Sequence, residues 1–237
     1  MTRQGSAAPS RLQAGTAGFL YLLIIGFGLF GELYVRSGLI VEGDAAATAA
    51  NIMASPGLFR AGFTADAVML LCDVALAVLF YTLLRPVSPV LSLMAAAFRL
   101  TQAAVLGANL LHFYAPLLLL QGDLYANAFQ AGQLNAAVML FLELHSYGYD
   151  LGLLFFGLSN LLLGYLMMRS DSFPGLLGAG VAAAGAVYLV GSFARFLLPG
   201  YAALLEPLYL IPLIAELSLS LWLLFIGGEG SKGSTHA

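Results

Sequence analysis

The chain has 237 residues, of which 61% are hydrophobic and only 9% are Asp, Glu, Lys or Arg. A soluble domain usually has about 25% charged residues, so this chain lacks the charge to cover a water-facing surface, and its mean hydropathy of +0.93 indicates a polytopic membrane protein. The net charge of −3 comes without a basic stripe, which excludes nucleic-acid binding, and the single cysteine, Cys72, excludes an intrachain disulfide framework.

Six segments are apolar and long enough to cross a membrane as helices, which takes about 20 residues each. In chain order they are Ala17–Val35, Ala61–Leu84, Pro89–Ala115, Tyr147–Met168, Pro174–Leu198 and Ala202–Ile226. The sequence therefore predicts an all-α helical bundle with one six-helix transmembrane domain at 17–227. A cytoplasmic tail at 1–16 and a flexible tail at 228–237 are expected on either side.

The loops between these segments differ in length. The turns at 85–89 and 170–174 are short and use proline to restart a helix. In the longer first loop, Asp44 stands before the helix-favouring run AAATAANIMA as a candidate N-cap. The apolar stretch 116–146 either extends two membrane helices or forms a separate hairpin. We expect a helical cap over the extracytoplasmic end.

The orientation follows from the basic residues in the short loops. With both termini inside, the cytoplasmic side carries Arg3, Arg11, Arg85, Arg169 and Lys232, and the outer side carries Arg36, Arg60 and Arg195. This bias predicts cytoplasmic termini. The first apolar segment lacks a small-residue cleavage site after it, so we expect it to be retained as a helix.

A weak internal repeat is found at an offset of 84 residues. It aligns Asp66 with Asp150, Tyr81 with Tyr165 and Arg85 with Arg169. The two copies run in the same direction, unlike the inverted repeats of many transporters. The plainer interpretation is that Tyr and Arg end both helices because they anchor at the membrane interface.

Ionisable residues within the spans cost about 2.5–3.5 kcal/mol each on insertion scales, so each needs a partner or a function. At a rise of about 1.5 Å per residue, Asp73, Arg99 and Glu216 all lie near the midplane. The second and third spans are joined by a tight turn, so Asp73 and Arg99 are the expected ion pair, and Glu216 is expected to join them. Two carboxyls that share one guanidinium disfavour simultaneous ionisation, which suits a proton-coupled site. A static pair that fixes helix packing is the alternative.

A second polar layer is predicted nearer the outer side. Asp66, Asp150, Asn109 and His112 reach similar heights, and Gln102 shares a helix face with Asn109. These residues predict an outward-facing polar vestibule above Asp73 and Arg99. An ordinary interfacial shell of water-satisfied side chains is the alternative.

The usual hydrolase, zincin and ATPase signatures are missing from the sequence, which has no GxSxG, HExxH or Walker motif. A metal or haem site would have to use His112 and His145, with Glu143 or Asp150 completing it. Two histidines without a short characteristic spacing are a weak indication. We therefore expect no metal, no cofactor and, on balance, no enzymatic activity.

Four segments together resemble a known family. They are the run from Gly43 to Val87, then FRLTQAAVLGANLL, ELHSYGYDLGLLFFGLSNLLLGYLMMRS and AELSLSLWLL. They are similar to bacterial membrane proteins grouped as domain-of-unknown-function family 4386. The resemblance runs from about Gly18 to Phe225 and implies a compact multi-pass inner-membrane protein with no assigned activity. The positions it singles out are Arg60, Asp73, Arg99, Gln102, His145, Tyr149, Asp150 and Gly152.

Our first functional expectation is a membrane protein whose polar pocket binds a small or lipidic ligand or a partner subunit. The pocket residues would be Asp73, Arg99, Glu216, Gln102, Asn109, Asp66, His145, Tyr149 and Asp150. The alternatives are a proton-coupled small-solute transporter, an intramembrane metal- or haem-dependent enzyme, and an accessory subunit of a larger membrane complex. The expected surroundings are the lipid bilayer of the bacterial inner membrane and, through small-residue faces such as Gly148 and Gly152, a second copy of the chain.

Overall fold

The computed structural model describes residues 10–227, so the tail at 228–237 and most of the tail at 1–16 lie outside the described residues. Between residues 10 and 227 the chain forms helices and turns, with no strand. Six helical stretches in this range are long and apolar enough to span a membrane: Arg11–Leu39, Pro56–Leu84, Pro89–Gln121, Ala131–Met168, Gly175–Leu197 and Leu204–Phe225. The prediction of an all-α membrane bundle is thereby confirmed.

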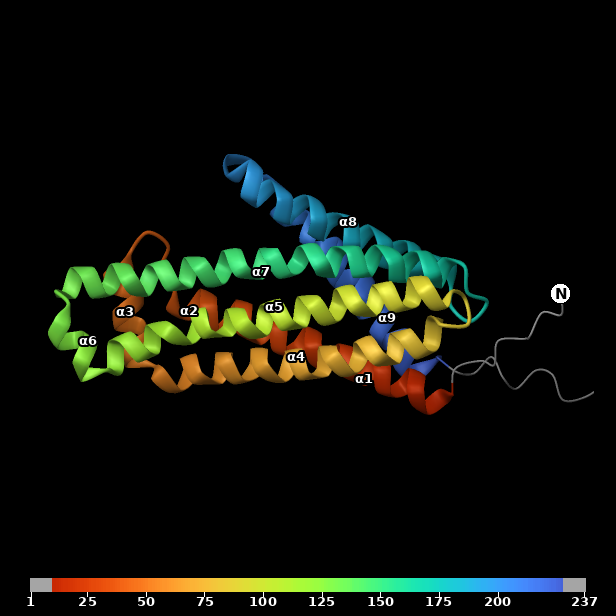
Figure 1. Cartoon of the computed structure of the whole chain (residues 1–237), viewed down its shortest axis with the longest axis horizontal. Coiled ribbons are helices and arrows are strands. Elements are labelled where there is room, and N and C mark those ends of the chain that lie inside the picture. The colour runs from red at the N-terminus through yellow and green to blue at the C-terminus, as the bar shows by residue number, and fades with distance from the viewer. Residues whose placement is uncertain (1–9, 228–237) are drawn as a thin grey trace, which may run out of the picture. The chain divides into compact units, whose positions relative to one another are not determined.

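The described chain divides into two compact units. Unit 1 comprises residues 10–25, 72–103 and 152–227, and unit 2 comprises residues 26–71 and 104–151. Four helices, labelled in Figure 1, contribute residues to both units. They are α1 (Arg11–Leu29), α4 (Pro56–Leu84), α5 (Pro89–Gln121) and α7 (Ala131–Met168). Unit 1 also holds α8 (Gly175–Leu197), a 3₁₀ segment η2 (Pro199–Tyr209) and α9 (Leu210–Phe225). Unit 2 also holds a π-helical segment η1 (Phe30–Arg36), α2 (Ser37–Leu39), α3 (Ala45–Ala54) and α6 (Asp123–Ala128).

The core of unit 1 is built where apolar faces of its helices meet. Tyr21, Phe80 and Leu84 are buried there together with Leu163, Leu166, Met167, Val181, Leu219 and Leu223. Small residues bring the helices close. A methyl group on Gly18 of α1 would lie 2.6 Å from the backbone of α9, and one on Gly164 of α7 would lie 2.5 Å from the backbone of α8. Glycine is therefore required at both crossings.

The core of unit 2 contains stacked aromatic rings. Phe59 and Phe113 lie face to face with ring centroids 4.4 Å apart, and Val35, Ile52, Leu117 and Leu142 are buried around them. The start of α3 is fixed by a polar contact. Asp44 caps this helix by accepting a hydrogen bond from the backbone of Ala47 over 2.9 Å, as the sequence predicts.

Some observed helix ends agree with the predicted bounds, and others differ from them. The stretch 116–146 extends the membrane helices: α5 runs to Gln121, past the predicted end at Ala115, and α7 begins at Ala131 rather than Tyr147. The short α6 connects them. The predicted sixth span begins as the 3₁₀ segment η2 and becomes α-helical only at Leu210. Pro207 lies inside η2, and in an α-helix its ring would clash with the carbonyl four residues earlier.

Candidate functional site

The most deeply buried charges of unit 1 are Asp73 on α4 and Arg99 on α5. Their residues are 3% and 1% exposed. Arg99 Nε donates a hydrogen bond to Asp73 Oδ1 over 2.7 Å, and Nη2 makes an ion-pair contact with the same oxygen at 2.5 Å. Gln102, one turn beyond Arg99 on α5, donates to Asp73 Oδ2 over 2.6 Å when its amide nitrogen is turned toward that oxygen. Both carboxylate oxygens of Asp73 thus have donors.

Arg99 is surrounded by aromatic rings. Its guanidinium carbon lies 4.8 Å from the ring centre of Phe156, 5.3 Å from that of Tyr21 and 5.8 Å from that of Phe80. Rings at such distances attract a cation through their negative faces, by about 2 kcal/mol or more where water is excluded. The rings do not replace hydrogen-bond acceptors. Among the described residues neither Nη1 nor Nη2 has an acceptor in hydrogen-bonding geometry, although Nη2 keeps its ion-pair contact.

A second buried carboxyl lies in the same unit. Glu216 on α9 is 7% exposed, and its Oε1 accepts hydrogen bonds from Asn160 Nδ2 over 3.2 Å and from the Tyr188 hydroxyl over 3.1 Å. Both donors are neutral. Glu216 is also near enough to Arg99 and Asp73 for the charges to interact. Three helices, α4, α5 and α9, therefore carry three buried ionisable groups within range of one another's charge, while α7 and α8 supply Asn160 and Tyr188.

We call Asp73, Arg99, Gln102, Asn160, Tyr188 and Glu216 the ionic cluster. The structure places the expected Asp73–Arg99 pair in direct contact, and Gln102 belongs to the same group. Glu216 differs from the expectation in its hydrogen bonds, because it binds Asn160 and Tyr188 instead of the guanidinium. The role of these residues as a ligand site stays a prediction.

Unit 2 contains a separate polar group, which we call the histidine cluster: Arg36, Asp66, Asn109, His112 and His145. Arg36 Nη2 forms an ion pair with Asp66 and lies 3.2 Å from Nε2 of His145. Because an arginine can only donate, this Nε2 accepts. Gly31 makes room for the pair, since a methyl group there would lie 2.8 Å from the Arg36 guanidinium and 2.9 Å from Asp66.

The other half of the histidine cluster is centred on Asn109. Its Nδ2 donates to the backbone carbonyl of His145 over 2.7 Å, and its Oδ1 lies 3.0 Å from Nδ1 of His112. His145 Nδ1 lies 3.2 Å from the Asn109 carbonyl oxygen, so the neutral tautomer with its proton on Nδ1 fits both neighbours. Gly148 leaves no spare room beside Asn109, because a methyl group there would overlap the carboxamide.

The two histidines do not form a ready metal site. Both nitrogens of His145 are occupied by Arg36 and Asn109, and a cation at Nε2 would meet the positive charge of Arg36. In the part of the chain at 10–227, three or more His, Cys, Asp or Glu side chains nowhere come together as a metal site requires. Of the remaining predicted site residues, Tyr149 packs its ring edge-on against His145 at 6.3 Å, and Asp150 is buried.

Three members of these clusters are not predicted from the sequence. Asn160 and Tyr188 are not among the predicted site residues, although an asparagine in the run FGLSNLLLG is unusual for a membrane span. Arg36 is expected only as a basic residue at a helix end, whereas the structure buries most of its side chain against Asp66. The π-helical turn at Phe30–Arg36 sets its direction, and π-turns occur often at functional sites.

Comparisons with known proteins give a family and no activity. The family model described as "Domain of unknown function (DUF4386)" matches residues 16–227. The chain is similar to an uncharacterized protein of Archaeoglobus fulgidus, with 28% identity over 164 residues that cover 69% of this chain and 82% of the relative. No solved structure matches the chain. Since the family model covers nearly the whole described chain, this membrane-embedded helical protein belongs to the DUF4386 family.

Proposed function

We propose that this protein is a proton-coupled membrane transporter of a small solute, with Glu216 as the group that binds the proton. The observation that carries the proposal is that the ionic cluster holds more carboxyl groups than cations. Two carboxyls, Asp73 and Glu216, share the surroundings of one guanidinium, Arg99, and all three side chains are buried. Buried carboxyls without a full complement of cations are a common feature of proton pathways in membranes.

Charge balance selects which carboxyl carries the proton. If both were ionised, one negative charge would remain uncompensated in an apolar interior, which is costly. Asp73 has the guanidinium and the Gln102 amide as direct donors, which favours its charged form. Glu216 accepts only from the neutral groups of Asn160 and Tyr188 in the hydrogen bonds described. The neutral arrangement of the cluster is then Asp73⁻, Arg99⁺ and a protonated Glu216.

Asn160 provides further support for a proton on Glu216. Its Oδ1 is buried and has no hydrogen-bond donor among the described residues, while its carboxamide lies 3.2 Å from the Glu216 carboxyl. A carboxylic acid is a donor as well as an acceptor. If the amide turns over, Oδ1 accepts the proton of Glu216 in place of the hydrogen bond that Nδ2 donates to Oε1, so a protonated Glu216 can bind Asn160 in either orientation of the amide.

A small or lipidic ligand bound at Arg99 is the second candidate, and the η nitrogens favour it because their unused hydrogens can hold an anionic group. The small volume of the cavity beside Arg99 argues against a preformed ligand site. The cavity beside Arg99 has a volume of about 10 Å³ for a water-sized molecule, whereas small-molecule pockets usually have about 300–1,000 Å³. A ligand would need the helices of unit 1 to separate, and a proton needs no such space.

The proposal is tested on the purified protein in lipid and in proteoliposomes. Infrared spectroscopy should show a carboxyl C=O band of a protonated acid that is lost in Glu216→Gln. The band should persist in Glu206→Gln, a matched control in η2 whose side chain is exposed. Vesicles with a pH gradient should take up protons together with one member of a panel of small solutes, and Glu216→Gln should abolish this uptake. A band that survives in Glu216→Gln, or no solute-dependent proton uptake by the wild type, would overturn the proposal.

A further inference from the structure

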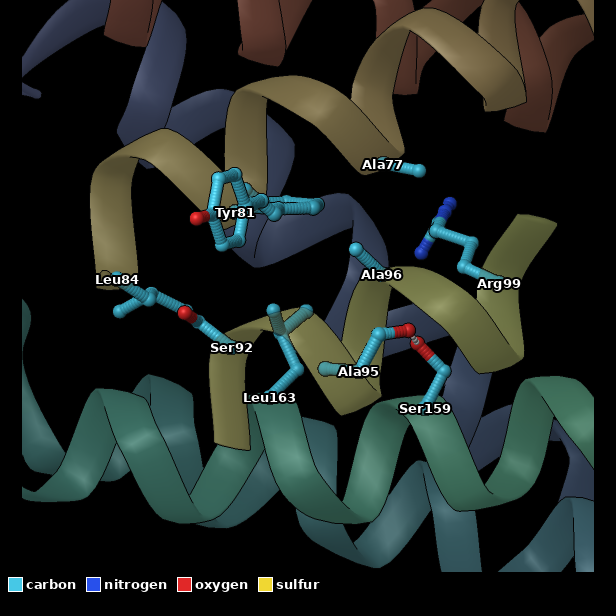
Figure 2. Close-up of a pocket in the computed structure, with 10 residues that line it drawn as sticks. Ala77, Tyr81, Leu84, Ser92, Ala95, Ala96, Arg99, Ser159 and Leu163 are labelled. Carbon is cyan, nitrogen blue, oxygen red and sulfur yellow. Dashed lines mark hydrogen bonds between the residues drawn. The ribbon is translucent and has the colours of Figure 1, made fainter. Parts of the chain in front are cut away.

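A narrow cavity adjoins the ionic cluster within unit 1, and Figure 2 shows its lining. It lies among α4, α5 and α7, with Arg99 at one end and Leu84 and Ser92 at the other. Seven residues separate Arg99 from Ser92 along α5, so the cavity follows two helical turns, or about 10 Å, toward the α4–α5 turn. Its walls are mostly apolar, and the polar groups in it are few: Arg99, the hydroxyls of Ser92 and Ser159, and Tyr81.

The guanidinium of Arg99 extends from α5 toward α4 at the edge of this cavity (Figure 2). Its two η nitrogens are buried, and among the described residues neither has an acceptor in hydrogen-bonding geometry. An unsatisfied donor in an interior is costly, and more so when it is charged. The cavity supplies both the room and the direction for an acceptor. About 10 Å³ for a water-sized molecule corresponds to one water.

The serine hydroxyls decide the chemistry of the occupant. Ser159 Oγ donates its hydrogen to the Ala95 carbonyl over 2.8 Å, the contact drawn in Figure 2, and Ser92 Oγ donates to the Pro89 carbonyl over 3.2 Å. Each hydroxyl therefore offers only lone pairs to the cavity. An anion accepts from Arg99 but is repelled by these lone pairs. A water molecule accepts from Arg99 and donates to a serine oxygen.

Charge balance points the same way. Asp73 already neutralises Arg99, and an added anion would bring a further negative charge beside Glu216. We propose that the cavity binds one water molecule, held between Arg99 and the Ser159 hydroxyl, and that protons reach the ionic cluster through this water. The binding of water stands on geometry alone, and its role as a proton route rests on the proposed function.

The water is tested first by a high-resolution structure of the wild-type protein in lipid. The expected result is a single water-sized density within hydrogen-bond distance of an η nitrogen of Arg99 and of Ser159 Oγ. A cavity that is empty in a map resolving other waters would overturn the inference, as would a density that follows chloride or bromide in the buffer.

The role is tested by hydrogen–deuterium exchange of the Glu216 carboxyl, followed as the shift of its C=O band after transfer to D₂O. Ala96→Val adds two methyl groups to the cavity wall and should slow this exchange by about tenfold, the factor that corresponds to one lost hydrogen bond. Ala103→Val is the matched control, because Ala103 is buried on the same helix outside the cavity lining. It should leave the exchange rate unchanged.

A second variant tests the same role if Ala96→Val fails to fold. The change Ser159→Ala adds no bulk and removes the lone-pair partner of the water, so it should slow the exchange in the same direction. An unchanged rate in Ser159→Ala, or equal slowing by Ala103→Val, would overturn the water route. The two proposals fail separately. A missing Glu216 band overturns the proposed function, whereas a Glu216 band whose exchange rate is unchanged in the cavity variants overturns only the route.

Discussion

Breaking the Asp73–Arg99 pair from its two sides should give unequal losses of stability. Arg99→Met removes the only buried guanidinium described in unit 1 and leaves Asp73 with Gln102 as its donor. Asp73→Asn leaves the guanidinium with its aromatic rings and with Glu216 nearby. Glu216 can then release its proton and become the counter-charge of Arg99, and Asp73 has no comparable substitute cation after Arg99→Met.

The magnitudes follow from these contacts. Stranding one member of a buried pair costs about 3–5 kcal/mol, and Arg99→Met loses the 2.7 Å hydrogen bond together with three cation–ring contacts. We therefore expect Arg99→Met to lower the free energy of unfolding by about 3–5 kcal/mol. Asp73→Asn loses a charge-assisted hydrogen bond while Glu216 compensates, so the expected loss is about 1.5–3 kcal/mol.

The assay is reversible unfolding in mixed micelles, followed by the fluorescence of Trp222, the only tryptophan of the chain, which packs against Phe173 in unit 1. The double variant should lose less than the sum of the two single losses, because the pair interacts directly. A loss of less than about 1 kcal/mol for Arg99→Met, well below the range for a broken buried pair, would refute this expectation. Strictly additive single losses, or a larger loss for Asp73→Asn than for Arg99→Met, would refute it as well.

Three further changes test packing and capping by the same unfolding measurement. Gly18→Ala should lose about 1–3 kcal/mol, because the added methyl group meets the α9 backbone at 2.6 Å, whereas Gly15→Ala, with nothing within 4 Å, should be neutral or stabilising; equal effects would contradict the close α1–α9 crossing. Gly148→Ala should lose about 1–3 kcal/mol by overlapping the Asn109 carboxamide, and a variant as stable as the wild type would show that the carboxamide can move aside. Asp44→Ala should lose about 0.5–2 kcal/mol, because the N-cap of α3 is removed; Asp44→Asn, which keeps an acceptor, should lose little, and equal losses would rule out capping as the cause.

The fold was predictable wherever a local pattern carried it. The apolar runs located all six spans, and Asp44 ahead of an alanine-rich run located the start of α3. The residues from Pro116 to Ser146 were harder, because an apolar helix of a membrane span and an apolar helix beyond it have the same composition. The π-helical turn at Phe30–Arg36 was not predicted, because the sequence analysis found no local pattern for it.

The site was predictable to the extent that depth and short connections determine it. Asp73 and Arg99 lie at matched depths on helices joined by a turn of a few residues, so their contact followed from counting. The partners of Glu216 did not follow, because Asn160 and Tyr188 come from α7 and α8. Whether those side chains face α9 depends on the rotation of each helix about its axis.

The sequence by itself determined that this chain spans a membrane as helices, and which buried groups would be costly without partners, because hydrophobicity and charge are properties of single residues. The tertiary structure decided which partners those groups have: Glu216 with neutral donors, and Arg99 with its η nitrogens beside a water-sized cavity. The physical reason is that hydrogen bonds act over about 3 Å and in fixed directions. Such contacts are set by how α4, α5, α7, α8 and α9 pack on one another, which is a property of the whole chain.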